Sequence, residues 1–344
     1  MQKIRSLDFA RGFTVLMIAP IHTVLLYSKL SVRETLIGKL LAFIAEGPGA
    51  QLFMMIMGIF FALSAQKSFF LICKRAFYLL VAGYFLNIVK FVIPNYFGWL
   101  PASLLHDLNI DAGSKDYLTL FSIGDILHFA ALATLSLYAV SKMKYPGFTA
   151  IGLASIYTVL SPYFWDIHSR YAVADYLFLL FGGSPPEVFF PFFPWIVYPL
   201  VGLSIGVFIK RSKELKYPFW LCRDMGWVLI ILGNLLSRIL NQDTGTSFYR
   251  SDFNGTIIHV GIVLVWLSVW QWIEENVAHN YFFDVLVYMS RNITSIYIIQ
   301  WIIIFWLLPV FGYQRLGTDA SVCAIALTGF LTFTISFLFK KKLK

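Results

Sequence analysis

Three ionisable side chains lie in the apolar stretch SLDFARGFTVLMIAPIH, residues 6–22. Asp8 and Arg11 are three residues apart, so on a helix they are neighbours on one face and can neutralise each other. His22 follows eleven residues after Arg11. Eleven steps of about 100° return to nearly the same face, about 16 Å further along the axis. The spacing therefore predicts a paired arginine at one end of a helix and an imidazole deeper on the same face.

Such groups in an apolar helix need a physical reason. In a membrane each costs about 2.5–3.5 kcal/mol near the centre, and it normally faces a protein or water interior. A free imidazole titrates near neutral pH, which suits histidine to general-base chemistry. We therefore expect His22, Arg11 and Asp8 to form the catalytic set. The alternatives are a structural Asp–Arg pair at the helix start and a histidine whose hydrogen bonds are satisfied in the core.

Further polar side chains interrupt the apolar runs later in the chain. Those expected at middle to outer depth, as substrate-binding candidates, are Gln51, Asp125, His128 and Gln300. Asp125 and His128 are three apart, so the carboxylate can orient the imidazole, or the two can form a structural pair. Gln300 could simply bridge two helices. The candidates to line an entry path for substrate at the outer face are Glu46 and His259, with Arg238 and Asn254.

The segment Gly47-Pro48-Gly49 predicts a helix start, because proline is favoured in the first helical turn. Free N–H groups at such a start can bind a carbonyl or an oxyanion. An ordinary helix start without that role is the alternative.

Arginines are expected at the inner membrane surface. Arg11, Arg75 and Arg291, the last followed by Asn292, come at the inner ends of three apolar runs. Guanidinium groups bind phosphate oxygens well, so these residues are candidates to bind phosphate groups. Ordinary placement of positive charge on the inner side is the alternative, above all for Arg75.

The composition is that of a polytopic membrane protein. The chain has 344 residues, is 59% hydrophobic and 13% charged, and has a mean hydropathy of +0.74. Soluble proteins are about 45–50% apolar and about 25% charged. Apolar runs of about 20 residues, the length that crosses a bilayer, recur throughout. We expect an all-α bundle of about ten transmembrane helices that forms one domain over residues 1–344.

The hydropathy pattern places the ten helices and leaves one segment open. The predicted spans are 7–28, 48–66, 76–93, 117–141, 147–164, 190–209, 219–240, 255–273, 283–308 and 320–339. Residues 165–189 lie between two spans and could hold a short interfacial or re-entrant helix. With the N-terminus inside, sixteen Lys and Arg residues fall on the inner side and seven on the outer side. This asymmetry predicts that both termini are cytoplasmic.

Several classes of function are disfavoured. The net charge of +9 comes from Lys and Arg in short loops and the C-terminal tail, so it does not indicate nucleic-acid binding. The three cysteines are scattered, which argues against a disulfide framework and a thiolate metal site. No two histidines have the spacing of metal ligands, and we expect no metal.

Five stretches of the sequence resemble one family. Asp8-Phe-Ala-Arg11-Gly12 followed by Met17 and His22 is similar to the first helix of the transmembrane acyltransferase superfamily, which includes the acyltransferase-3 proteins. The other stretches lean toward the branch with the heparan-α-glucosaminide N-acetyltransferase catalytic domain and its bacterial relatives. They are GPGAQLFMMIMGIFFALS (47–64), GDILHFAALATL (124–135), FFPFFPWIVYPLVGLSIG (189–206) and SRNITSIYIIQW (290–301).

The resemblance implies an enzyme that moves an acyl group, acetyl first among the options, from cytoplasmic acetyl-CoA to a sugar-like hydroxyl or amine. The acceptor, a glycan or amino sugar, would come from the other side of what we expect to be a bacterial inner membrane. Here His22 would act as base, Gln51 or the start of the second span would stabilise the oxyanion, and Arg11 would position the donor. A covalent acyl-histidine route and a homodimer are open alternatives. The rival function is a multi-pass transporter or exporter of small solutes, which would also bury charges in interrupted helices.

Overall fold

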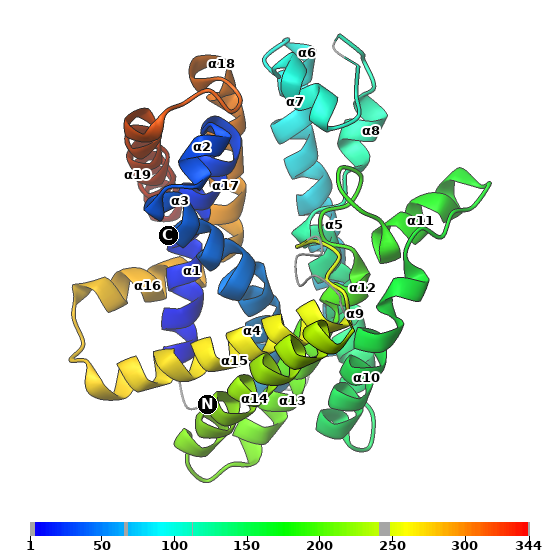
Figure 1. Ribbon diagram of the computed structural model, residues 1–344, viewed down its shortest axis with the longest axis vertical. Coiled ribbons are helices and arrows are strands. Elements are labelled where there is room, and N and C mark those ends of the chain that lie inside the picture. Colours follow the sequence, from blue (N-terminus) through cyan, green and yellow to red (C-terminus); the bar gives the residue numbers. More distant parts are fainter. Residues whose placement is uncertain (1–3, 65–67, 112, 241–247, 343–344) are drawn as a thin grey trace. The chain divides into compact units, whose positions relative to one another are not determined.

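The computed structural model describes residues 4–64, 68–111, 113–240 and 248–342. Within these ranges the regular structure is helical, with two isolated β-bridges and no β-strand, so the predicted all-α membrane fold is confirmed (Figure 1). Eight of the described helices are long and apolar enough to cross a membrane. They are Arg5–Tyr27, Leu36–Leu63, Phe69–Tyr96, Pro146–Phe164, Phe192–Arg211, Lys216–Ile239, Phe253–Asn276 and Thr318–Phe339. Three shorter apolar helices accompany them: Ile126–Ser141, Ala172–Gly182 and Ile293–Trp306.

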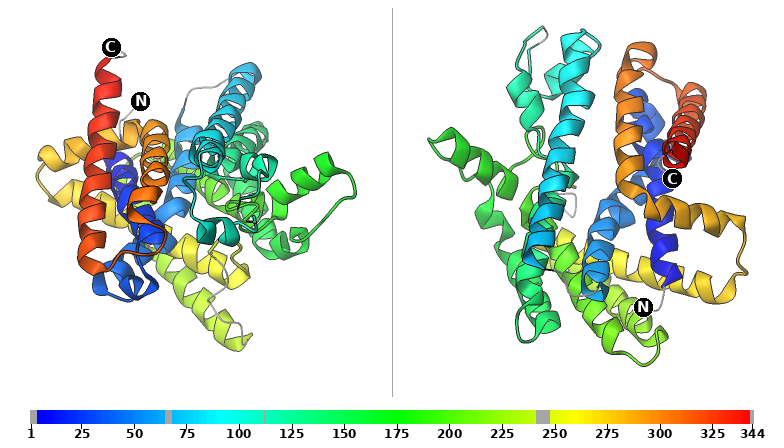
Figure 2. Two further views of the ribbon diagram at one scale, coloured as in Figure 1. Left: turned by 90° about the horizontal axis from the view of Figure 1, so that it is seen from above. Right: turned by 180° about the vertical axis from the view of Figure 1, so that it is seen from behind.

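The helices belong to two compact units. The first unit comprises Met1–Gly49, Tyr84–Ser122 and Asn276–Lys344, and the second comprises Ala50–Gly83 and Ile123–Glu275. Each unit therefore combines segments that are far apart in the sequence. Figure 2 colours the chain by residue number, from which the segments of each unit can be located.

Helix α1 (Arg5–Tyr27) is the centre of the first unit. It contacts α16 (Tyr281–Arg291), α17 (Ile293–Trp306) and α19 (Thr318–Lys342). At its end the chain forms a short backbone ladder, in which the N–H of Lys29 donates to the carbonyl of Leu316 at 2.9 Å. Leu36–Ile44 (α3) and the π-helical turn η1 (Ala45–Gly49) also contact α1. The N- and C-terminal parts of the sequence thus build one core.

The rest of the first unit is the end of α5 (Phe69–Asn87) and short elements. The π-helical turn η2 (Ile88–Val92) continues α5 and contacts α17. The other elements are α2 (Leu30–Arg33), α6 (Ile93–Tyr96), α7 (Ala102–Asp107), α8 (Tyr117–Ser122) and α18 (Leu308–Phe311). The loop after α18 is tied to α7, because the Tyr313 hydroxyl donates to Asp107 at 2.8 Å. Burial, with help from this carboxylate, raises the pKa of Tyr313 to about 12, so the phenol stays a donor at neutral pH.

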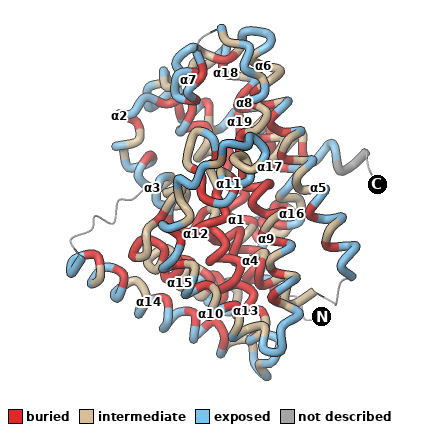
Figure 3. The backbone as a smooth tube through the Cα atoms, turned by 90° about the vertical axis from the view of Figure 1, so that its right-hand side faces the viewer, coloured by how far each residue is buried: buried red, intermediate tan, exposed pale blue. Residues whose placement is uncertain are grey.

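The second unit is built on the pair α4 (Ala50–Leu63) and α13 (Val197–Arg211), both largely buried in Figure 3. A Cβ on Gly58 would overlap the carbonyl oxygen of Pro199, and one on Gly202 would overlap that of Met55. The two backbones therefore touch, which is how small residues allow helices to associate in a membrane. The remaining elements are α9 (Ile126–Ser141), α10 (Pro146–Leu160), η3 (Ser161–Phe164), α11 (Ala172–Gly182), α12 (Phe192–Trp195), α14 (Lys216–Ile239) and α15 (Phe253–Asn276).

Two predicted spans are not continuous helices. The prediction of one helix over 117–141 is wrong, because α8 ends at Ser122 and α9 begins after Asp125. The freed backbone at Gly124 is satisfied by the 187–189 segment: its N–H donates to Glu187 at 2.8 Å and its carbonyl accepts from Phe189 at 2.9 Å. The span predicted over 283–308 also divides, at Asn292. Irregular backbone at membrane depth is tolerated where protein satisfies it.

The second predicted span begins earlier than expected. Its helix runs continuously from Leu36 to Leu63, so Gly47-Pro48-Gly49 lies in the π-helical turn inside it. The prediction of a helix start with free N–H groups there is wrong. A proline in mid-helix removes one backbone donor and crowds the preceding turn, and a widened π turn accommodates both effects. Residues 65 and 66 of the predicted span, and the basic residues Lys3, Lys67 and Lys344, lie outside the described residues.

Candidate functional site

Asp8 and Arg11 form a closed cluster with Ser290 in the first unit. The Arg11 Nη2 lies 3.3 Å from Asp8 Oδ1, as the spacing predicted. The Arg11 Nε donates to Ser290 Oγ at 2.8 Å, and the Ser290 hydroxyl donates to Asp8 Oδ1 at 2.6 Å. Each group thus has two partners within the cluster. This arrangement holds the guanidinium in one orientation and joins α1 to the end of α16.

Gly12 makes this cluster possible. A Cβ at this position would overlap the backbone carbonyl of Leu286 on α16. Only glycine lets the two backbones approach so closely. Ser290 lies one helical turn beyond Leu286 on α16, and it is thereby brought to Arg11. The Arg11-Gly12 pair in the sequence therefore has a local physical explanation.

His22 lies beside Gln300, from α17, in the same unit. The imidazole Nδ1 is 3.1 Å from the amide oxygen Oε1 of Gln300. The amide nitrogen of Gln300 donates to the carbonyl of Tyr297 at 3.2 Å, which turns the amide so that its oxygen faces His22. Gln300 is fully buried, and His22 is half-buried.

These contacts determine the tautomer of the neutral imidazole. An amide oxygen can only accept, so Nδ1 must carry the hydrogen and donate it. The other ring nitrogen, Nε2, then carries the lone pair. Nε2 is the nitrogen that can accept a proton from a reacting group. The hydrogen bond between Nδ1 and Gln300 fixes the orientation of the ring.

The indole of Trp301 supports the same imidazole. The two rings are stacked with centroids 3.9 Å apart and planes 22° from parallel. The indole also lies below the ammonium of Lys90, whose Nζ is 4.7 Å from its ring centroid. Imidazole and ammonium therefore share one aromatic neighbour.

Ser290, Trp301 and Lys90 are not among the site residues predicted from the sequence. A signal existed for Lys90, because it is a lone lysine in the apolar run YFLNIVKFVIP, and a charge inside such a run indicates function by default. Ser290 and Trp301 gave no such signal. A serine and a tryptophan are ordinary in membrane helices, and their partners are about 280 residues earlier in the chain.

Asp125 and His128, in the second unit, form a helix cap. Asp125 Oδ1 accepts from the N–H of Ile126 at 2.6 Å, and the N–H of Asp125 donates to His128 Nδ1 at 3.1 Å. The His128 imidazole thus accepts a hydrogen bond from the backbone N–H of Asp125. The expected contact was with the carboxylate of Asp125. Gly83 leaves space for this ring, because a Cβ there would lie 2.7 Å from its Cε1. The geometry favours the structural reading of this pair.

The other substrate-binding candidates are spread over both units. Gln51 is fully buried in α4 of the second unit, and Glu46 is exposed in η1 of the first. His259 Nδ1 lies 3.3 Å from the hydroxyl of Ser251 at the start of α15, near the fully buried Asn254. Arg238 is exposed at the end of α14.

The arginines expected at the inner surface are also divided between the units. Arg291 is exposed at the end of α16, next to the Ser290 that binds Arg11. Asn292 donates to the Tyr288 carbonyl at 2.7 Å and separates α16 from α17. Arg75 is exposed in the part of α5 that belongs to the second unit.

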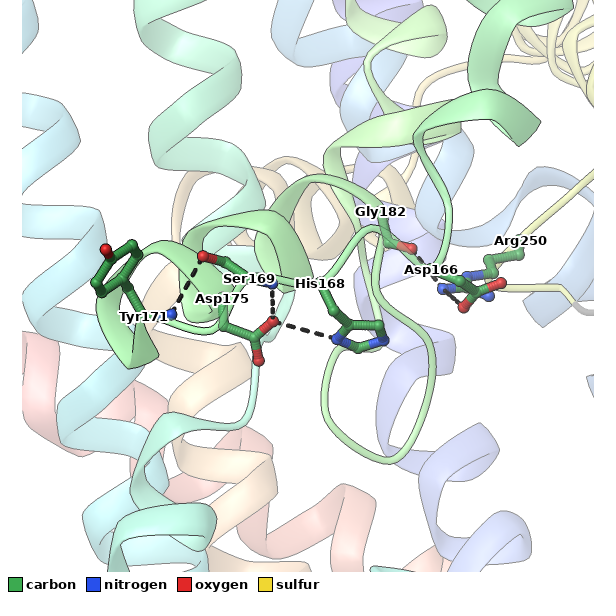
Figure 4. A network of polar contacts seen from close by, with 7 residues as sticks. All are labelled: Asp166, His168, Ser169, Tyr171, Asp175, Gly182 and Arg250. Atoms are coloured by element: carbon green, nitrogen blue, oxygen red, sulfur yellow. Dashed lines mark hydrogen bonds and ion pairs between the residues drawn. The ribbon is translucent and has the colours of Figure 1, made fainter.

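The segment 165–189, which the sequence suggested could hold a short helix, contains α11 (Figure 4). Arg250 holds its end: Nε donates to the carbonyl of Gly183 at 2.9 Å, and Nη2 donates to Asp166 at 2.9 Å and to the carbonyl of Gly182. At its start Asp175 accepts from the N–H of Ser169 at 2.8 Å. These contacts are a structural clamp. Within the described residues, no group of three or more His, Cys, Asp or Glu side chains has the arrangement of a metal site.

Comparison with known proteins identifies a family. No curated protein and no solved structure matches the chain. A family model matches residues 3–238, more than half of the chain, and its description is heparan-alpha-glucosaminide N-acetyltransferase, catalytic. The match includes Asp8, Arg11 and His22, and it ends before Ser290 and Gln300. The chain therefore belongs to the heparan-alpha-glucosaminide N-acetyltransferase catalytic family.

Proposed function

We propose that this protein is a membrane acetyltransferase in which His22 is the general base. The acetyl group comes from cytoplasmic acetyl-CoA and goes to a sugar-like hydroxyl or amine that arrives from the opposite side. The observation that carries this proposal is the hydrogen bond between His22 and Gln300, which leaves Nε2 as the basic nitrogen. Membership of an acetyltransferase family supports the reaction type.

The reaction is a direct transfer. The acceptor oxygen or nitrogen attacks the thioester carbonyl, and its proton passes to His22 Nε2 as the new C–O or C–N bond forms. The C–S bond then breaks, and the proton returns from Nε2 to the departing thiolate. The products are the acetylated acceptor and free CoA.

The cluster of Asp8, Arg11 and Ser290 has the chemistry to hold the phosphate end of the donor. The guanidinium is fixed by the carboxylate and the hydroxyl, and its side chain is still 20% exposed. Arg291 is exposed beside it. Along α1 this cluster lies eleven residues, about 16 Å, from His22. That separation suits a donor whose phosphates and thioester are at opposite ends of an extended pantetheine arm.

The decisive experiment compares His22→Ala with His106→Ala, a matched change at a histidine whose side chain is 90% exposed. Both variants are purified in lipid nanodiscs, and release of CoA thiol from acetyl-CoA is measured with amino sugars as acceptors. We expect His22→Ala to lose at least about 10²-fold in rate, the smallest usual effect of a general base, and His106→Ala to keep the wild-type rate. Wild-type transfer by a folded His22→Ala variant would contradict the proposal.

The transporter alternative predicts a different result in the same preparation. A transporter would exchange a labelled sugar across liposomes without consuming acetyl-CoA. An acetyltransferase consumes one thioester for each acetylated sugar that mass spectrometry detects.

A further inference from the structure

The proposed transfer creates a negative charge beside the base. When the acceptor attacks the thioester carbonyl, the electron pair of the C=O π bond moves onto the oxygen, and N–H donors fixed at that oxygen are usually the largest single contribution to catalysis. The helix start predicted at Gly47-Pro48-Gly49, which was expected to offer free N–H groups, lies inside a continuous helix. A donor from another element of the first unit would fill this role.

The indole of Trp301 carries such a donor. Its Nε1 is buried and has no acceptor among the residues that the structure describes. An indole nitrogen can only donate, so a buried N–H without an acceptor is costly, and an oxygen of a bound molecule removes that cost. Trp301 as a whole is half-buried, and so is His22. The pair therefore lies at the edge of the packed interior, where a molecule can approach it.

The packing around Trp301 holds its ring in place. The indole stacks on the His22 imidazole with ring centroids 3.9 Å apart. It also contacts the rings of Tyr297, at 6.3 Å between centroids, and Phe305, at 5.6 Å. Because Trp301 directly follows Gln300 on α17, consecutive residues touch the imidazole on its face and at Nδ1. A donor held in this way needs no reorganisation when charge develops on a substrate oxygen.

We propose that the Trp301 indole N–H is the oxyanion donor of the acetyl transfer, which makes Trp301 a further catalytic residue. This inference rests on the proposed function and adds a residue to the same site. As the new bond to the acceptor forms and the proton passes to His22, the carbonyl oxygen gains the π electron pair and accepts from Nε1. When the C–S bond breaks, that pair re-forms the carbonyl, the thiolate of CoA takes the proton from His22, and the indole N–H is unchanged.

The stacked rings suit two neighbouring atoms of one reacting centre. The planes of the imidazole and the indole are 22° from parallel. A proton acceptor in one plane and a donor in the next can therefore address two atoms bonded to the same carbon, the attacking atom and the carbonyl oxygen. The imidazole alone cannot serve both, because its Nδ1 hydrogen is donated to Gln300.

The test compares kcat and KM in lipid nanodiscs, with acetyl-CoA and the amino sugar that gives the fastest wild-type release of CoA thiol. Trp301→Phe keeps an aromatic ring on His22 and removes the N–H. We expect its kcat to fall at least about 10²-fold, the usual effect of losing one oxyanion donor. KM for acetyl-CoA should change little, because the donor acts only in the transition state. Trp306→Phe, on the same helix, removes an N–H that donates to the Val89 carbonyl at 3.0 Å, and it should keep the wild-type kcat.

A second replacement separates the N–H from the shape of the ring. In 3-benzothienylalanine a sulfur atom stands where indole has its N–H, and the bicyclic shape is kept. Introduced at Trp301 by nonsense suppression, it should lower kcat as much as Trp301→Phe does. A wild-type kcat with this residue would show that only the ring matters, and the proposal would be overturned. The same measurement decides if Trp301→Phe fails to fold.

The outcomes distinguish this inference from the proposed function. If the wild type transfers acetyl and His22→Ala does not, an unchanged kcat in folded Trp301→Phe overturns the oxyanion donor and leaves the enzyme standing. If kcat falls in both Trp301 variants while His22→Ala keeps the wild-type rate, the donor is supported and the base is contradicted. A wild type that consumes no acetyl-CoA contradicts the proposed function and this inference with it.

Discussion

At the scale of single residues, Gln300 has a clearer role than the sequence indicated. Hydropathy placed it inside a membrane span, and amide chemistry allowed either a contact with substrate or a bridge between helices. The structure places its oxygen at His22 Nδ1 and its nitrogen at a backbone carbonyl, so it bridges helices and orients the His22 imidazole at once. A pattern of residue types cannot predict such a contact, because the two residues are 278 positions apart.

A charge change at Gln300 tests its role. In Gln300→Glu the new carboxylate would stabilise the protonated imidazole, so the acid limb of the kcat/KM profile should move to higher pH. Gln300→Met keeps the approximate size but cannot accept the Nδ1 hydrogen, and it should lower kcat about fivefold, the value of one hydrogen bond. Rates measured from pH 5 to 9 decide this. A profile that is the same in all three proteins would show that Gln300 does not act through His22.

Ser290 gives a second prediction at this scale. Ser290→Ala leaves Asp8 and Arg11 in place but removes the hydroxyl that joins them to α16. Because both lost hydrogen bonds involve a charged partner, we expect a destabilisation of about 1.5–3 kcal/mol and a higher KM for acetyl-CoA. Thermal unfolding and acetyl-CoA titrations measure the two effects. Ser268→Ala, which loses only a bond to its own helix, is the matched control and should change neither by as much.

At the scale of elements, the sequence was reliable for uninterrupted helices and unreliable at their breaks. A hydropathy average over 117–141 or 283–308 stays high across a short break, so it cannot detect one. The break before α9 depends on pairing with residues 187–189, a non-local contact. The π-helical turns η1 and η2 were not predicted for a similar reason: a hydropathy average does not change when a helical turn contains one extra residue. Lys90 was missed at such a site.

Gly12→Ala tests how closely α1 and α16 must approach. The added methyl would overlap the Leu286 backbone, so the helices must separate, at a cost of about 1–3 kcal/mol typical of overpacking. Activity should fall with stability, because Ser290 would withdraw from Arg11. Gly329→Ala on α19 is the matched control: nothing lies within 4 Å of its added Cβ, and alanine favours the helix. If both variants melt at the wild-type temperature, the contact between α1 and α16 at Gly12 tolerates an added methyl group, and the prediction is wrong.

At the scale of the whole molecule, composition and hydropathy were sufficient for the fold class, and the family match agrees with it. The candidate site depends on more than the matched residues. Asp8, Arg11 and His22 lie within residues 3–238, whereas Ser290, Gln300 and Trp301 come from the segment after them. This later segment packs on α1 and completes the core of the first unit. The motif in the first helix therefore identified the part of the candidate site that lies on α1. The residues that contact this part are known only from the tertiary structure.

The orientation of the chain in the membrane is the last prediction, and the loops provide its test. The excess of Lys and Arg on one set of loops predicts that both termini and the 212–215 loop are cytoplasmic, and that the 113–116 loop faces the other side. Lys213 and Lys115 are exposed in these two loops. After Cys73, Cys222 and Cys323 are replaced by serine or alanine, a single cysteine is introduced as Lys213→Cys or Lys115→Cys.

A membrane-impermeant maleimide applied to intact cells should label Lys115→Cys, and it should label Lys213→Cys only after permeabilisation. This orientation is required by the proposed reaction, because it puts the cluster around Arg11 on the side where acetyl-CoA is available. Labelling of Lys213→Cys in intact cells would show that the true topology is the reverse of the predicted one. The Arg11 cluster would then face away from the cytoplasmic acetyl-CoA pool, and the assignment of the donor side would fail with it.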